Sequence, residues 1–235
     1  MNKLIKFELK RNRLKTYHIA VVIITVVILS FLYLLAAIPQ IDAADSDTEM
    51  FMSYDFIIGL GNIISMAVFS IMSSVMASKF IVDEYTGKKA ILLFCYPVDR
   101  KKILDAKIII VLFYTAISML VCNGIATTVF LSTESLFPLC QDSIDIMLIW
   151  NCIFSVLCYS LMSALVSLAA VWLGFMKKSI IVTITSACVI VSILCQIIGM
   201  TLFIRPVITA ILAVILMIAI AVWINLHSQV EKMEV

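Results

Sequence analysis

The 235-residue sequence has few charged residues, which occupy 14% of its positions, whereas soluble globular proteins carry about 25%. Hydrophobic residues make up 63% of the chain. A soluble domain could not cover its surface with so few charges. The formal net charge of +2 is too small to indicate a nucleic-acid partner, and none is expected.

The sequence also lacks the motifs that would place catalysis or a cofactor on this chain. Its two histidines, His18 and His227, lie near opposite ends of the chain and form no His-Glu-x-x-His zinc motif. The sequence contains neither a P-loop, Gly-x-x-x-x-Gly-Lys-Ser/Thr, nor a Gly-x-Ser-x-Gly nucleophile elbow. The seven cysteines show no metal-ligand spacing and are interpreted as small packing residues. We therefore expect a protein that is not an enzyme and binds no cofactor itself.

Long apolar runs are abundant and predict a membrane protein. Charge-free stretches cover residues 16–41, 56–78, 108–133, 146–176, 179–204 and 206–230, and each exceeds the roughly 20 residues needed to span a bilayer as a helix. The runs do not alternate between apolar and polar residues, as barrel strands would, so they should be helical. The predicted fold class is an all-α integral membrane protein, with one transmembrane domain over 1–235 and spans at about 17–40, 56–79, 103–131, 146–174, 179–203 and 206–226.

The basic residues are distributed very unevenly between the two sides of these spans. If the N-terminus is cytoplasmic, sixteen of the 17 Lys and Arg residues lie on the cytoplasmic side, and Arg205 alone lies outside. Because cytoplasmic loops are enriched in Lys and Arg, this bias predicts a multi-pass membrane protein with both termini cytoplasmic.

The chain begins with a basic segment, residues 2–15, that is interpreted as an amphipathic interfacial helix on the membrane surface. A plain positively charged anchor without helical structure is the alternative. A cleaved signal peptide is not favoured, because the apolar run that follows is much longer than the roughly 7–15 residues of a signal-peptide core.

Between spans two and three lies a polar cytoplasmic loop, residues 83–102, with an apolar centre. Thr86-Gly87 should end the preceding helix, and Pro97 should end the short apolar piece at 90–96. That piece is too short to cross the membrane and too apolar to stay in water. The loop is therefore predicted to dock a soluble partner.

Four amides fall inside the predicted spans: Asn62, Asn123, Asn151 and Gln196. An amide in hydrocarbon needs a polar partner, so each should face another helix or a cavity. Two interpretations remain open, namely a polar lining for a substrate route and hydrogen bonds that join helices.

These features together resemble the six-span permease subunits of ABC-2 type ABC transporters. The resemblance covers most of the chain and is sharpest in the loop, where Glu84, Thr86-Gly87, Leu92-Leu93, Pro97 with Arg100, and Ala106-Lys107 match the family pattern, with Thr-Gly in place of the commoner Gly-Thr. The size of the chain and its very short last outer loop are most similar to the small permeases of bacitracin or lantibiotic resistance.

The resemblance implies a separate P-loop ATPase subunit that holds ATP and Mg²⁺, and a second permease copy or paralogue. It implies that a coupling helix in the loop contacts the ATPase and rocks span two against span three. The residues implied in ATPase coupling are Glu84, Gly87, Leu92, Leu93, Phe94, Pro97 and Arg100.

The expected function is thus a non-catalytic permease subunit of an ATP-driven ABC exporter in a bacterial cell membrane, moving a hydrophobic or amphipathic peptide such as a peptide antibiotic. The alternative is an ATPase-independent membrane immunity or scaffold protein that binds a peptide without transporting it.

Overall fold

The computed structural model describes residues 8, 14–41, 51–85, 100–136, 145–201 and 205–231. In chain order its main elements are α2 (Lys15–Ile41), α3 (Tyr54–Ala77), the π-helical turn η2 (Ser78–Val82), α5 (Arg100–Glu134), α6 (Ile146–Lys177), α7 (Ile180–Met200) and α8 (Arg205–Glu231). With η2 counted as the end of α3, the described residues contain six helices that are long and apolar enough to cross a membrane. The predicted all-α class with six spans is confirmed.

Two predicted helices cannot be compared with this structure. The interfacial helix at 2–15 lies outside the described residues except for Glu8, Leu14 and Lys15. The coupling helix between spans two and three falls in 86–99, which also lies outside them.

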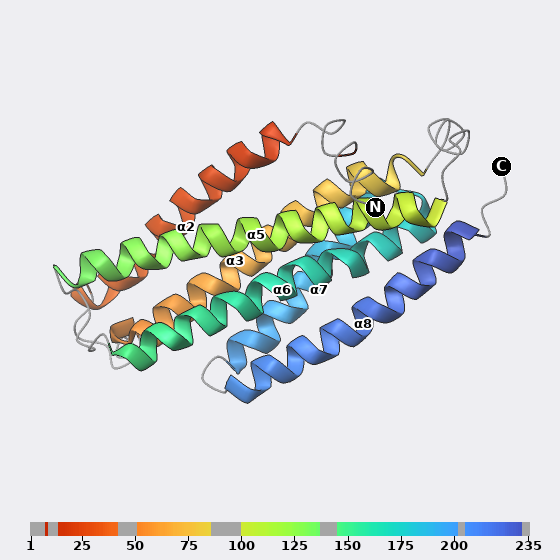
Figure 1. Ribbon diagram of the computed structural model, residues 1–235. Helices are drawn as coiled ribbons and strands as arrows, with labels where there is room; N and C mark the ends of the chain where they lie inside the picture. The colour runs from red at the N-terminus through yellow and green to blue at the C-terminus, as the bar shows by residue number, and fades with distance from the viewer. Residues whose placement is uncertain are drawn as a thin grey trace.

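The bundle is built around α3 and α6. In the most apolar 18-residue stretch of each helix, 56% of α3 and 61% of α6 is buried inside the protein, whereas only 17–22% of α2, α7 and α8 is buried. Helix α6 packs against α3, α5, α7 and α8, while α2 and α8 lie on opposite sides of the bundle (Figure 1). The exposed faces of the outer helices are apolar, for example at Ile19, Val26 and Ile224, as expected for surfaces that face lipid.

Helices α6 and α7 are joined by a very tight turn. Lys178 adopts a left-handed conformation with φ of 47°, and the amide of Ser179 donates to the carbonyl of Gly174 at 3.1 Å, closing the helix end. A Cβ at Gly174 would lie 1.7 Å from Oγ1 of Thr183 on α7. Glycine is therefore required here for the two helices to approach so closely.

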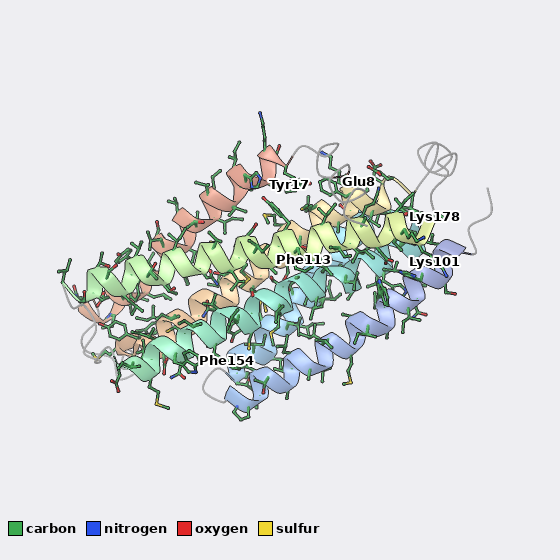
Figure 2. The ribbon with its side chains drawn as sticks, viewed as in Figure 1. Glu8, Tyr17, Lys101, Phe113, Phe154 and Lys178 are labelled. Carbon is green, nitrogen blue, oxygen red and sulfur yellow. The ribbon has the colours of Figure 1, made fainter. Side chains whose placement is uncertain are left out.

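The Lys residues of the described chain mark one end of the bundle, which we call the Lys-rich end: Lys15, Lys79, Lys101, Lys102, Lys107, Lys177 and Lys178. Figure 2 shows Lys101 and Lys178 both at this end, with Phe154 toward the other. At the opposite end, the Tyr54 hydroxyl donates to Oε2 of the buried Glu134 at 3.1 Å and so joins α3 to the last turn of α5. A polar contact between helices is thus found at the end opposite the Lys-rich end.

Candidate functional site

A buried ion pair at the Lys-rich end joins the two helices that flank residues 86–99. Lys107 in the second turn of α5 forms an ion pair with Glu84, which follows η2. The Lys107 side chain is only 1% exposed, and that of Glu84 is 20% exposed. Removing or separating one partner of such a pair would leave an uncompensated charge out of water, so Glu84 and Lys107 should stay together at this end.

Lys107 has two further partners, both supplied by the end of α3. Its Nζ donates to the Phe80 carbonyl at 2.9 Å, and it lies 5.7 Å from the centre of the Tyr85 ring, within range of a cation–π interaction. These contacts explain how a lysine can be buried at the edge of the membrane. They also compensate for the local loss of regular α-helical hydrogen bonding in η2.

The π-helical geometry of η2 is what brings these groups together. The amide of Asp83 donates to the Ser78 carbonyl at 2.9 Å, which is an i to i−5 bond and widens the turn. Single π-helical turns inside α-helices occur frequently at functional sites. Here the wide turn lies immediately before Glu84 and Tyr85.

Tyr85 completes the cluster. Its side chain is 2% exposed and packs at a tilt against the Phe175 ring at the end of α6. Burial raises the pKa of the Tyr85 hydroxyl well above its ordinary value of 10, and the neighbouring carboxylates of Glu8, Glu84 and Asp105 raise it further. The buried Glu8 lies at the same end of the bundle, as Figure 2 shows.

A second polar contact ties α5 to α8 at this end. Nε2 of His227 lies 2.7 Å from Oδ1 of Asp105, and Nε1 of Trp223 donates to the same oxygen at 3.1 Å. Asp105 and Lys107 therefore connect the first turns of α5 to α8 and to α3, respectively. A displacement of the start of α5 would be transmitted to both helices.

The structure describes only part of the predicted coupling set. Glu84 lies in the ion pair, and Arg100 is the first residue of α5. The other predicted coupling residues lie outside the described residues: Gly87, Leu92, Leu93, Phe94 and Pro97. Their contact with an ATPase stays a prediction.

The ion pair bears on the expected rocking of span two against span three. Such a motion at the Lys-rich end would separate Glu84 from Lys107 and leave a charge without its partner in a buried site. The rocking of span two against span three stays a prediction.

The structure brings two of the four amides into contact, and a substrate route along all four stays a prediction. Asn62 on α3 and Asn123 on α5 are both 2% exposed, and Nδ2 of Asn123 donates to Oδ1 of Asn62 at 3.0 Å. Asn151 is half-buried on α6, and Gln196 is exposed on α7. The first pair joins two helices, so its described contact is of the kind that holds helices together.

Sequence reasoning missed the pairing of Glu84 with Lys107 and the role of Asp105, His227 and Trp223. One signal was present, because Lys107 is immediately followed by an apolar run and charges at the edge of a span need partners. The described residues contain no group of three His, Cys, Asp or Glu side chains that could hold a metal ion.

Comparisons with known proteins support a transport role. The family model described as "ABC-2 family transporter protein" matches residues 4–195. The chain is also 28% identical over 190 residues to a protein of Bacillus subtilis (strain 168) called "Uncharacterized protein YcbO", covering 80% of this chain and 81% of that protein. No solved structure matches it. Because the family model spans most of the chain, including α2, α3, α5 and α6, this protein belongs to the ABC-2 family of transporter proteins.

Proposed function

We propose that the chain is the non-catalytic permease subunit of an ATP-driven exporter and that a separate P-loop ATPase docks at its Lys-rich end. The observation that carries this proposal is the buried Glu84–Lys107 pair, which joins the two helices on either side of residues 86–99. A soluble subunit that pushes on that segment would act on α3 and α5 together. The ATPase holds the ATP and Mg²⁺, and this chain supplies the membrane path.

The Lys-rich end faces the cytoplasm in this proposal. The described Lys residues gather there, while Glu134 and Asp145 lie at the other end of their helices. The positive-inside bias supports this orientation, and in the proposal both termini are cytoplasmic. An ATPase that uses cytoplasmic ATP could then reach residues 86–99.

A second permease copy is proposed to cover α7. This helix exposes a stripe of small and polar side chains at helical spacing, formed by Thr185, Cys188, Ser192, Gln196 and Gly199. Gln196 has no hydrogen-bond partner among the described residues, and an amide facing lipid is unfavourable. Small residues allow two membrane helices to approach closely. Crosslinking through the native Cys188 should yield a dimer that Cys188→Ser abolishes.

The cargo is proposed to be a hydrophobic or amphipathic peptide, such as a peptide antibiotic. Support for this class comes from the resemblance to the small permeases of antibiotic resistance. Transport assays with radiolabelled peptides in inverted vesicles, with and without ATP, test the cargo and the direction together.

The docking proposal is tested by purifying the tagged chain from native membranes and identifying bound proteins by mass spectrometry. A P-loop ATPase should be recovered with the native protein and lost with Leu92→Asp or Phe94→Asp. The matched control is Leu136→Asp, which adds the same charge at the exposed opposite end. Equal ATPase recovery with all variants would contradict docking at this segment. Peptide binding without ATP-driven movement would favour the immunity or scaffold alternative.

A further inference from the structure

An apolar groove lies along α5, α6 and α8 and ends at the contact between Asp105 and α8. Its volume is about 360 Å³. The walls are side chains such as Leu112 on α5, Leu168 on α6 and Leu216 on α8, and Trp223 lies near Asp105. In a membrane, an apolar groove of this kind is open to lipid rather than to water.

Among the described residues that line the groove, Asp105 alone is charged. Its carboxylate is 17% exposed, and both of its described hydrogen-bond contacts, from His227 and Trp223, are to Oδ1. Oδ2 therefore remains without a hydrogen-bond partner among the described residues. A carboxylate oxygen at the end of an apolar groove is suited to a ligand with an apolar tail and a hydrogen-bonding cation.

The dimensions of the groove fit one chain of a lipid. Asp105 and Leu112 are seven residues apart, which corresponds to about 10 Å along a helix, and one leaflet of the hydrocarbon core is about 15 Å deep. The volume accommodates about a dozen non-hydrogen atoms if each takes about the volume of a water molecule. A single acyl chain that enters from the Lys-rich end has this shape.

The charges near Asp105 complete the match to a phospholipid. Lys101 and Lys102 precede Asp105 by four and three residues, so they lie on the same side of α5. A zwitterionic head group places a phosphate beside its ammonium. The phosphate can then lie toward these lysines while the ammonium reaches the carboxylate.

We propose that this groove binds a membrane phospholipid whose head group carries a primary ammonium, such as phosphatidylethanolamine. One acyl chain lies in the groove, and the ammonium donates a hydrogen bond to Oδ2 of Asp105. The site does not depend on the ATPase or on the transported cargo. The bound lipid would contact both α5 and α8 beside the hydrogen bonds that join these helices at Asp105.

The test measures which lipid stays bound to the purified full-length chain. Native mass spectrometry is performed after incubation with phosphatidylethanolamine, phosphatidylcholine or phosphatidylglycerol of identical acyl chains. The native protein should retain phosphatidylethanolamine about tenfold better than the other two, because only its ammonium both carries charge and donates hydrogen bonds. Equal retention of phosphatidylcholine, or a preference for phosphatidylglycerol, would overturn the proposal without any variant.

Variants then locate the site. Asp105→Asn keeps an oxygen for Trp223 and His227 but removes the charge, so it should reduce phosphatidylethanolamine retention to the phosphatidylcholine level. Asp83→Asn removes an acidic charge outside the groove and should leave the preference unchanged. Persistence of the preference in Asp105→Asn would overturn the proposal.

A second pair of variants tests the groove itself. Ala219→Phe adds a ring at a buried groove position, whereas Ala213→Phe adds one on the exposed face of the same helix. Only Ala219→Phe should lower retention of all three lipids. Equal retention by the two variants would show that the chain binds lipid elsewhere.

Discussion

Breaking the Glu84–Lys107 pair should destabilise the protein through the charge that remains. Glu84→Gln leaves Lys107 charged at a site that is 1% exposed, and removing one partner of a buried pair costs about 3–5 kcal/mol. Lys107→Met leaves Glu84, whose side chain is 20% exposed and can be partly hydrated, so its cost should be at the lower end, about 3 kcal/mol. The double variant carries neither charge, so its loss of unfolding free energy should be much smaller than the sum of the losses in the two single variants.

The measurement is a double-mutant cycle of unfolding free energies for the full chain in a defined detergent or bilayer. We expect a coupling free energy of at least about 2 kcal/mol between the two positions. Lys177→Met is the matched control, because Lys177 is exposed at the same end, and it should change stability by no more than about 0.5 kcal/mol. Additive effects within about 0.5 kcal/mol would refute the reasoning that the pair joins α3 to α5.

Three further predictions follow from other contacts. Gly174→Ala should destabilise the protein by about 1–3 kcal/mol in the same unfolding assay, because the added Cβ would overlap Thr183 on α7. Gly124→Ala is the control: its added Cβ would meet no atom within 4 Å, so it should not destabilise the protein. Asn123→Leu should lower the free energy of unfolding by about 1 kcal/mol, because it removes the hydrogen bond to Asn62 on α3. Replacing both amides by Leu should restore most of that stability. A double variant as unstable as Asn123→Leu would contradict the pairing. Since the folded-state pKa of Tyr85 is raised above 10, stability should be intact below pH 10 and fall as the pH rises further, and Tyr85→Phe should reduce that alkaline loss in pH-dependent unfolding measurements.

The six spans could be predicted from sequence because each charge placed in hydrocarbon is costly, so charge-free runs mark the helices. The central position of α3 and α6 could not be predicted in the same way. All six runs are apolar, and apolar side chains that face lipid look the same in sequence as those that face another helix. Buried serines such as Ser73 on α3 and Ser163 on α6 were the available hint, since small residues mark helix contacts in membranes.

The candidate site depended even more on three-dimensional arrangement. Glu84 and Lys107 are separated by 23 positions, and their pairing depends on where the π-helical turn η2 places Glu84 relative to the start of α5. The same holds for Asp105 and His227, which lie 122 positions apart. The four amides could be recognised as groups that need partners, but sequence alone could not tell that Asn62 pairs with Asn123 while Gln196 lies on the exposed face of α7.

The central claim is our proposal that the end of α3 and the start of α5 move as one unit when the proposed ATPase acts on residues 86–99. Electron paramagnetic resonance distances in the assembled transporter test this claim directly. Spin labels are placed at Lys79 and Lys102, which are both exposed, and labelled subunits are diluted with unlabelled ones so that each distance is measured within one subunit. Addition of ATP should leave the 79–102 distance distribution unchanged while the distance from Lys79 to the exposed Lys15 on α2 changes. A shift of the 79–102 distribution on ATP binding would contradict the account, because the two helices would then be moving against each other.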